Sequence, residues 1–335
     1  MRLQLQQLVQ GRVQQCVSHN RSENPCEKIE RKKESNAKRG AEIVKVRAQG
    51  WITEAKLEGE NTAVCYSVHY LYLIKQEELM YIEEEIEERK ALFFNNHVIE
   101  DVAVDPFYDR LNKVDLPAQQ GLEQFNPAID AFRATQTVEA NEPFITIRGN
   151  GEHSQGTAFQ TKERVETARE RLSFRYNRLK AVQYAERWWN TYNPAYKNFE
   201  NDCTNFISQC LHQGGAPMMG YPNRGKGWWM RGQNYSYSWA VANSLKNFLG
   251  SSKTGLQARV VSNPEQLIFG DVICYDFQGD GRFDHNTIVT GKDANGMPLV
   301  NAHTYNSRQR YWAYEDSTAY TPNIKYKFYS IDDEQ

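Results

Sequence analysis

Cys203 stands in a stretch whose residue types could activate a thiol. Asp202 precedes it, an amphipathic run continues through Leu211, and Gly214-Gly215 follows. This pattern predicts a helix with Asp202 near the N-cap and Cys203 in the first turn. Unpaired backbone N–H groups and the positive end of the helix dipole favour an anion there and lower the pKa of a thiol. The position suits a nucleophile, and spacing alone leaves core packing as an equal alternative.

The sequence gives less reason to expect a nucleophile at the other cysteines. Cys210 falls in the middle of the same helix, and Cys274 falls in the apolar run Asp271–Tyr275, so both are expected in the core. Six cysteines at irregular spacing form no dense disulfide framework. We therefore expect a reduced, cytoplasmic protein.

Two histidines lie where a base for the thiol is needed. Residues 284–290 and 298–304 predict the two strands of a hairpin, and 291–296 its turn. His285 lies on the first strand, while Asn301 and His303 share one face of the second. A cysteine, a histidine base and a group that orients the histidine can together perform acyl transfer.

Metal binding is the alternative use of these residues. The two histidines could ligate a metal with Cys203 or Asp284, but no compact Cys/His cluster supports this. Residues 276–284 partly match the sequence pattern of a calcium-binding loop. Gln278 and Thr287 stand where that pattern requires acidic ligands, so a tight hairpin loop is expected instead. We expect neither a metal nor a cofactor.

Length and composition limit the class of protein to which these residues belong. A chain of 335 residues is long enough for two domains, and its net charge of −2 gives no indication of nucleic-acid binding. No apolar run is long enough for a membrane span, and the first residues lack the apolar segment of a secretory signal. Nothing in the sequence indicates an oligomeric state.

The chain divides into three parts by pattern. Residues 1–39 predict one charged helix, and 43–46, 64–74 and 80–94 predict long antiparallel strands, which together indicate a small α+β domain over 1–105. The acidic run 83–88 is interpreted as a solvated strand face or a helical insertion. Prolines and glycines mark 106–160 as a linker. A second domain over 161–335 includes a helix within 176–192 that Asn193-Pro194 ends.

A series of motifs in the second domain resembles a known family. The longest is the stretch from Tyr192 to Gln209, and shorter ones follow in the same order: Gly214–Met218, Trp228-Trp229, Gly270–Ile273, Asp284-His285, Ile288–Thr290 and His303-Thr304. Together they resemble the putative amidase domain of spore-forming Gram-positive bacteria, which is similar to papain-like NlpC/P60 and CHAP peptidoglycan hydrolases. The resemblance covers about 176–330. It implies a papain-like α+β fold with a nucleophile helix packed on an antiparallel sheet.

The resemblance also implies roles for individual residues. Cys203 matches the nucleophile, His285 the general base, and the strand 299–304 the third group, for which His303 is favoured over Asn301. The backbone N–H of Cys203 would contribute to an oxyanion hole. The expected substrate contacts are Tyr196, Asp202, Trp228 and Trp229, although packing roles suit Tyr196 and the tryptophans equally.

The expected function is that of a cysteine amide hydrolase acting on peptide or amide bonds of peptidoglycan-type material through a thioester. Two alternatives remain open. One is a catalytically silent module that binds wall peptides or a protein partner, and the other is an intracellular acyltransferase, associated with sporulation, that uses the same site.

Overall fold

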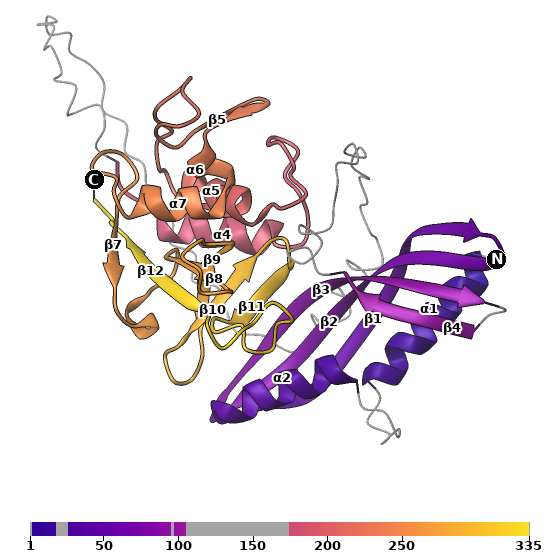
Figure 1. Ribbon diagram of the computed structural model, residues 1–335. Coiled ribbons are helices and arrows are strands. Elements are labelled where there is room, and N and C mark those ends of the chain that lie inside the picture. The colour runs from indigo at the N-terminus through magenta and orange to yellow at the C-terminus, as the bar shows by residue number, and fades with distance from the viewer. Residues whose placement is uncertain (1, 18–25, 95–96, 105–173, 335) are drawn as a thin grey trace, which may run out of the picture. The chain divides into compact units, whose positions relative to one another are not determined.

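The computed structural model describes residues 2–17, 26–94, 97–104 and 174–334 (Figure 1). All of these residues belong to one compact unit. The expected linker at 106–160 lies outside the described residues. The described chain is a mixture of helices and strands built around a large antiparallel sheet, as the expected α+β class requires.

Long strands dominate the N-terminal region. β1 (Ala41–Glu58), β2 (Asn61–Gln76), β3 (Leu79–Phe94) and β4 (His97–Ala103) pair antiparallel in chain order. The alternating residues Val64, Tyr66, Val68, Tyr70 and Tyr72 of β2 are all buried and belong to one hydrophobic cluster. The predicted strands at 43–46, 64–74 and 80–94 are therefore confirmed.

Two helices pack against this part of the sheet, α1 (Arg2–Val17) and α2 (Glu27–Lys38). The prediction of one helix over 1–39 was wrong. Cys26, at the N-cap of α2, has extended backbone with φ −69° and ψ 110°, so α2 begins as a separate helix. A disulfide joins Cys16 of α1 to Cys26, the residue before α2, so the expectation that every cysteine is reduced was also wrong.

The C-terminal region adds more helices and the rest of the sheet. The helices are α4 (Arg178–Trp188), α5 (Cys203–Gln213), α6 (Tyr237–Ala240), α7 (Ala242–Leu249) and the short 3₁₀ helix η2 (Pro264–Gln266). The strands are β7 (Ala258–Val261), β8 (Val272–Asp276), β9 (His285–Lys292), β10 (Pro298–Ala302), β11 (Ser307–Tyr311) and β12 (Lys325–Ile331). A separate small hairpin consists of β5 (Met230–Arg231) and β6 (Asn234–Tyr235).

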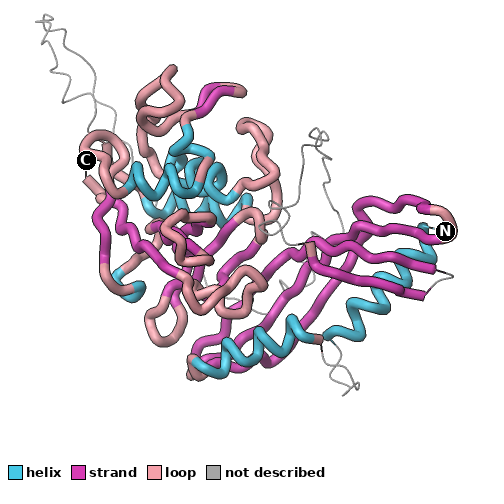
Figure 2. The backbone as a smooth tube through the Cα atoms, in the orientation of Figure 1, coloured by secondary structure: helices cyan, strands magenta, loops and turns pink. Residues whose placement is uncertain are grey.

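One sheet runs through both regions in the order β1-β2-β3-β11-β10-β9-β8-β12-β7, with β4 also paired to β3. Figure 2 shows the strands in magenta and the helices in cyan. The junction is the pairing of β3 with β11, where Ser307 lies opposite Glu85 and Arg308 opposite Glu84. In the part of the chain that the structure describes, no helix is long and apolar enough to span a membrane.

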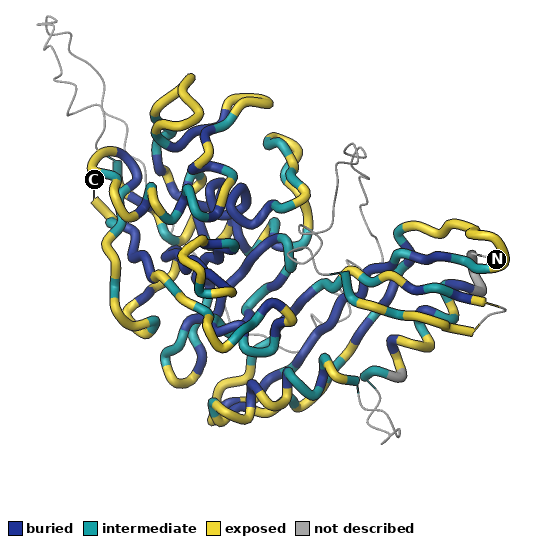
Figure 3. The backbone as a smooth tube through the Cα atoms, viewed as in Figure 1, coloured by how far each residue is buried: buried dark blue, intermediate teal, exposed yellow. Residues whose placement is uncertain are grey.

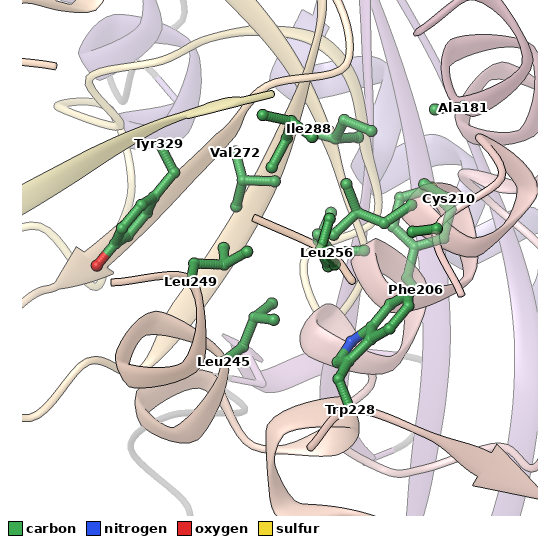
Figure 4. Close-up of a cluster of buried hydrophobic side chains, with 14 of the residues drawn as sticks. Ala181, Phe206, Cys210, Trp228, Leu245, Leu249, Leu256, Val272, Ile288 and Tyr329 are labelled. Atoms are coloured by element: carbon green, nitrogen blue, oxygen red, sulfur yellow. The ribbon is translucent and has the colours of Figure 1, made fainter. Parts of the chain in front are cut away.

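The helix α5 is held against the sheet by one apolar stripe. Its residues Phe206, Ile207, Cys210 and Leu211 are fully buried, and they pack in the same cluster as Val272 and Ile288 of the strands (Figure 4). Burying each large apolar side chain contributes about 1.5–3 kcal/mol, so this stripe fixes how α5 lies on β8 and β9. The helix ends at the glycine pair that the sequence indicates, where Gly215 adopts a positive φ of 103° that other residues disfavour.

The other face of the sheet carries a second buried layer. Ile273, Tyr275 and Phe277 pack there with Val289, Val300 and Tyr314. Figure 3 shows buried backbone continuing through the strands of this region, with exposed segments at the loops. Strands buried on both faces hold their side chains in fixed positions, which is what a site built on them requires.

The acidic run on β3 is buried where it was expected to be solvated. Glu83, Glu84 and Glu85 are each at most 4% exposed. Their partners are basic side chains of α2 and β11, such as Lys32 and Arg308, which lie far away in the sequence. The interpretation as a solvated face was wrong because the run lies where β3 joins the rest of the sheet, and the sequence around it does not show those partners.

Candidate active site

Cys203 is the first residue of α5 and is only 3% exposed. Asp202 occupies the N-cap position, as predicted, but its side chain makes no capping hydrogen bond. The hydroxyl of Thr304 does so instead, because its Oγ1 accepts from the backbone N of Asp202 at 3.0 Å and from that of Cys203 at 3.1 Å. A residue from the loop after β10 thus caps the helix that carries the thiol.

The thiol has polar neighbours on two elements. Its Sγ lies 3.7 Å from Oγ1 of Thr204 and 3.9 Å from the carbonyl oxygen of Asp284, the residue before β9. The side-chain amide of Asn286 donates to the same Thr204 hydroxyl at 2.9 Å. Because that oxygen accepts from Asn286, its own hydrogen can point to the sulfur and favour the thiolate.

Cys210 and Cys274 are the other two buried free cysteines of this region. Burial raises the pKa of Cys210 far above that of an ordinary thiol, and burial also raises the pKa of Cys274. Both side chains are fully buried in the hydrophobic core, as the sequence predicts. These two thiols are therefore held in the protonated form that suits packing.

His303 lies beside the start of α5, where it contacts Asp202. Its Nδ1 is 2.8 Å from Oδ2 of Asp202 and its Nε2 is 2.7 Å from the carbonyl oxygen of Trp188, the last residue of α4. Its ring also stacks on Phe206, with the ring centres 4.0 Å apart. Both ring nitrogens of His303 therefore face acceptor oxygens, one of a carboxylate and one of a backbone carbonyl.

Asn301 is tied to a different set of residues. Its Oδ1 accepts from the Thr290 hydroxyl at 2.7 Å and from the backbone N of Gln309 at 2.9 Å. Its Nδ2 donates to Glu186 of α4 at 2.8 Å. This network links β9, β10, β11 and α4, and it suits a role in holding these elements together.

His285 begins β9 and is fully buried. Its Nε2 lies 3.3 Å from the hydroxyl of Tyr314, and its ring packs among Tyr275, Phe277 and Tyr314. The next residue, Asn286, donates to the Thr204 hydroxyl of α5 at 2.9 Å. The Cys203 sulfur lies near the start of this strand, 3.9 Å from the carbonyl oxygen of Asp284, the residue before His285.

Thr304 and Tyr314 are the residues that sequence reasoning missed as parts of the site. Thr304 has a φ of 76°, which is unusual for a β-branched residue. Its position directly after His303 in the matched motif was the only signal for it. The expected oxyanion donor, the backbone N–H of Cys203, donates to Thr304 in this structure. Tyr314 lies in a loop with no local signal at all.

The expected substrate contacts differ in exposure. Trp228 and Trp229 are almost fully buried, and their indole N–H groups donate to Ser208 and to backbone carbonyls. Tyr196 is partly exposed and stacks on Trp239, with the ring centres 6.1 Å apart. Asp202 is 1% exposed and accepts from the Asn205 amide at 2.8 Å. Burial favours packing roles for the tryptophans and leaves Tyr196 at the surface.

The loop before β9 forms a turn around Asp276. The carboxylate of Asp276 accepts from the backbone N atoms of Gly279, Asp280 and Gly281 at 2.7–3.2 Å. The loop is thus a hairpin turn that uses its acid internally. Among the described residues, no group of three or more His, Cys, Asp and Glu side chains is placed to hold a metal ion.

A buried thiol at a helix N-terminus, packed on an antiparallel sheet beside a strand that begins with histidine, defines a mixed α and β protein with a candidate cysteine site. Residues 175–329 match the family described as "Putative amidase domain", which indicates amide hydrolysis in general terms. The chain is 47% identical to the uncharacterized protein YhbB of Bacillus subtilis (strain 168), over 91% of this chain and 86% of that protein. It therefore belongs to the same family as YhbB.

A second relative is more distant. The uncharacterized protein YjcM of Bacillus subtilis (strain 168) is 31% identical over 140 residues, which are 39% of this chain and 31% of that protein. No solved structure matches the chain.

Proposed function

We propose that the protein is a cysteine amide hydrolase that cleaves peptide or amide bonds of peptidoglycan-type material. The observation that carries the proposal is the position of the Cys203 thiol. It lies at the N-terminus of α5, next to the Thr204 hydroxyl and to the first residues of β9. A papain-like arrangement of helix and sheet is part of the same proposal.

The proposed chemistry has two halves. The thiol of Cys203 gives its proton to His285 and attacks the substrate carbonyl, and His285 then protonates the amine as the C–N bond breaks. This leaves a thioester. A water molecule, deprotonated by His285, attacks the thioester, releases the acid and returns the proton to the thiol. No oxidant, reductant or further reactant is needed.

His285 is the better of the two candidate bases. The ring nitrogens of His303 face a carboxylate and a carbonyl, and both of these only accept. The Nε2 of His285 faces a hydroxyl, which can accept as well as donate. In this proposal Nδ1 of His285 receives the thiol proton, and His303 positions Asp202 at the start of the nucleophile helix.

The segment between α5 and α7 supports an anionic peptide substrate. Tyr221 and Tyr237 are about half exposed. The guanidinium of Arg231 lies 4.6 Å from the ring centre of Tyr221, and that of Arg224 lies 5.1 Å from that of Tyr237. Exposed rings beside cations can contact both the apolar and the carboxylate parts of a wall peptide.

The test compares Cys203→Ala with Cys210→Ala, which removes a buried thiol from the same helix. Each variant and the wild type are incubated with muropeptides, and cleaved stems are identified by mass spectrometry. We expect wild type and Cys210→Ala to cleave and Cys203→Ala to be inactive. Equal cleavage by wild type and Cys203→Ala would refute the proposal.

A catalytically silent binding module is the second candidate. The observation in its favour is that the backbone N–H of Cys203 already donates to Thr304, where an oxyanion would otherwise bind. Rapid alkylation of Cys203 by iodoacetamide at pH 6 would argue for the enzyme, because a silent buried thiol reacts slowly.

A further inference from the structure

The loop after β11 brings a tyrosine hydroxyl to the ring of His285. The Oη of Tyr314 lies 3.3 Å from Nε2 of His285 and 3.4 Å from Oγ of Ser307. All three side chains are fully buried. Tyr314 adopts a positive φ of 58°, so its backbone is held in a conformation that a tyrosine rarely takes. Arg310 covers its ring, with the guanidinium carbon 4.2 Å from the ring centre.

We propose that Tyr314 is the positioning residue of His285, and that the N-terminal region holds Tyr314 in place through buried ion pairs. The inference rests on the proposed function, in which His285 is the base. It adds a role for residues 26–94, which carry no part of the thiol site.

The hydroxyl can select the ring tautomer that the reaction needs. A base that receives the thiol proton at Nδ1 must carry its own proton at Nε2. Tyr314 can accept from that Nε2–H while it donates its own hydrogen to Ser307. The chain from His285 through Tyr314 to Ser307 then fixes both the tautomer and the orientation of the imidazole.

Tyr314 acts in this scheme as a neutral partner. Burial raises its pKa to about 12, although Arg310 opposes that shift. The hydroxyl therefore stays protonated at physiological pH. The rings of Tyr275 and Phe277 also lie beside the imidazole, and Asp284 precedes it in the chain. A hydroxyl orients the imidazole through hydrogen bonding and adds no full charge.

Five residues, named here the charged cluster, connect this loop to the N-terminal region: Lys32, Glu83, Glu85, Arg310 and Asp316, whose side chains are at most 7% exposed. Asp316, two residues after Tyr314, accepts from Nζ of Lys32 at 2.6 Å and from Nη2 of Arg310 at 2.9 Å. Lys32 lies on α2 and also pairs with Glu83 of β3. Nη1 of Arg310 lies 3.6 Å from a carboxylate oxygen of Glu85.

The cluster therefore holds Tyr314 from two sides. Arg310 covers the ring of Tyr314, and Asp316 fixes the loop just beyond it. Both depend on charges from α2 and β3, because Lys32 balances Asp316 and Glu85 lies beside Arg310. A substitution in α2 should therefore change the position of the His285 imidazole through these contacts, although α2 makes no part of the thiol site.

The first experiment compares Tyr314→Phe with Tyr275→Phe in the full chain. Tyr275 is a matched control because it lies in the same buried layer, while its hydroxyl bonds to Thr287 and to the carbonyl of Trp312. The tautomer of His285 is measured by ¹⁵N NMR, with His285→Gln used to assign its signals. The rate of Cys203 alkylation by iodoacetamide is measured from pH 5 to 9.

We expect the wild type and Tyr275→Phe to show the Nε2–H tautomer, and Tyr314→Phe to lose that preference. Alkylation at pH 6 should fall about tenfold in Tyr314→Phe, while the rate at pH 9 stays within about twofold. An unchanged tautomer in Tyr314→Phe, or an equal loss in Tyr275→Phe, would overturn the proposal.

The second experiment tests the role of the N-terminal region. Lys32→Met removes the cation that balances Asp316, Lys32→Arg keeps it, and Lys38→Met removes an exposed cation from the same helix. We expect alkylation at pH 6 to fall about threefold in Lys32→Met and to stay near wild type in the other two. The same rate of Cys203 alkylation in Lys32→Met and Lys38→Met would overturn the proposed role of the N-terminal region.

Measuring the tautomer of His285 tests the role of Tyr314 independently of the proposed function. If muropeptides are not cleaved but the tautomer changes as expected in Tyr314→Phe, the proposed function fails and Tyr314 still positions His285. If cleavage depends on Cys203 and the tautomer does not change, the proposed function stands and the role of Tyr314 is refuted.

Discussion

Two buried polar regions of this protein use opposite means to satisfy their groups. In the charged cluster, cations and carboxylates lie against each other. Burial alone would raise the pKa of Asp316, but Arg310 and Lys32 outweigh it and lower that pKa. Around Cys203 the sulfur lies near the Thr204 hydroxyl and the Asp284 carbonyl. The ion pairs hold the groups of the first region in their charged forms, whereas the second region contains the thiol of the proposed site.

This difference indicates which region is structural. A buried ion pair loses several kcal/mol when one partner is removed, because the remaining charge has no water to solvate it. The pairing of β3 with β11 places the two regions on one sheet, so the ion-paired region can hold the candidate site in place.

The largest effect should come from Asp316→Asn, which leaves Lys32 and Arg310 buried without their shared carboxylate. We expect a loss of about 3–5 kcal/mol in the free energy of unfolding, measured by urea denaturation. Glu315→Gln is the matched control, since Glu315 pairs with the exposed Lys38, and it should leave the free energy of unfolding nearly unchanged. Similar losses in both variants would remove the contrast between buried and exposed pairs.

Acid should weaken the paired region through Glu84. Burial alone would raise the pKa of Glu84, but its hydrogen bond to His69 and its pairing with Arg308 lower that pKa from 4.5 to about 2. The folded state therefore gains about 3 kcal/mol above pH 4.5 and loses it as the pH falls towards 2. The stability difference between wild type and Glu84→Gln should shrink over that range, and a constant difference would contradict this.

The disulfide gives the N-terminal region a covalent link besides its ion pairs. Cys16 and Cys26 are 10 residues apart, so opening the link should cost about 2–3 kcal/mol. The double variant Cys16→Ser/Cys26→Ser tests this in thermal unfolding, with Cys65→Ser, a free cysteine, as control. Mass spectrometry under non-reducing conditions should find the linked peptides. Two free thiols in the folded protein would rule the link out.

The smallest effect concerns the thiol region. Thr204→Val keeps the shape of the side chain and removes the hydroxyl beside the sulfur. The loss of a hydrogen bond worth about 1 kcal/mol should slow alkylation of Cys203 at pH 6 roughly fivefold. Ser208→Ala on the same helix, whose hydroxyl bonds to Trp239, should leave the rate unchanged. Equal rates in all three proteins would mean that the Thr204 hydroxyl does not favour the thiolate.

Local pattern was enough to predict the elements around the thiol. The strand hairpin that begins at His285 and the helix that begins at Cys203 follow from apolar periodicity and from the glycines that end the helix. The burial of Cys210 and Cys274 follows from the same periodicity. These features depend on neighbours along the chain, which the sequence shows directly.

The acidic run on β3 shows what local pattern cannot predict. Charged residues in a strand are usually solvated, and only the pairing of β3 with β11 brings Arg308 and Arg310 to them. The link between α1 and α2 was missed for a related reason, since irregular cysteine spacing gives no pairing.

The order of residues along the chain was sufficient to show which thiol stands at a helix N-terminus and which strand carries a histidine at its start. Helix and strand periodicities, caps and turns are local properties, so they can be found without a fold. Three contacts could be found only in the folded structure. Thr304 caps that helix, the His303 ring contacts the Asp202 carboxylate, and the Tyr314 hydroxyl lies beside the His285 ring. Each of them joins residues from separate elements, and their distances are set by how the helices pack on the sheet and how β3 pairs with β11.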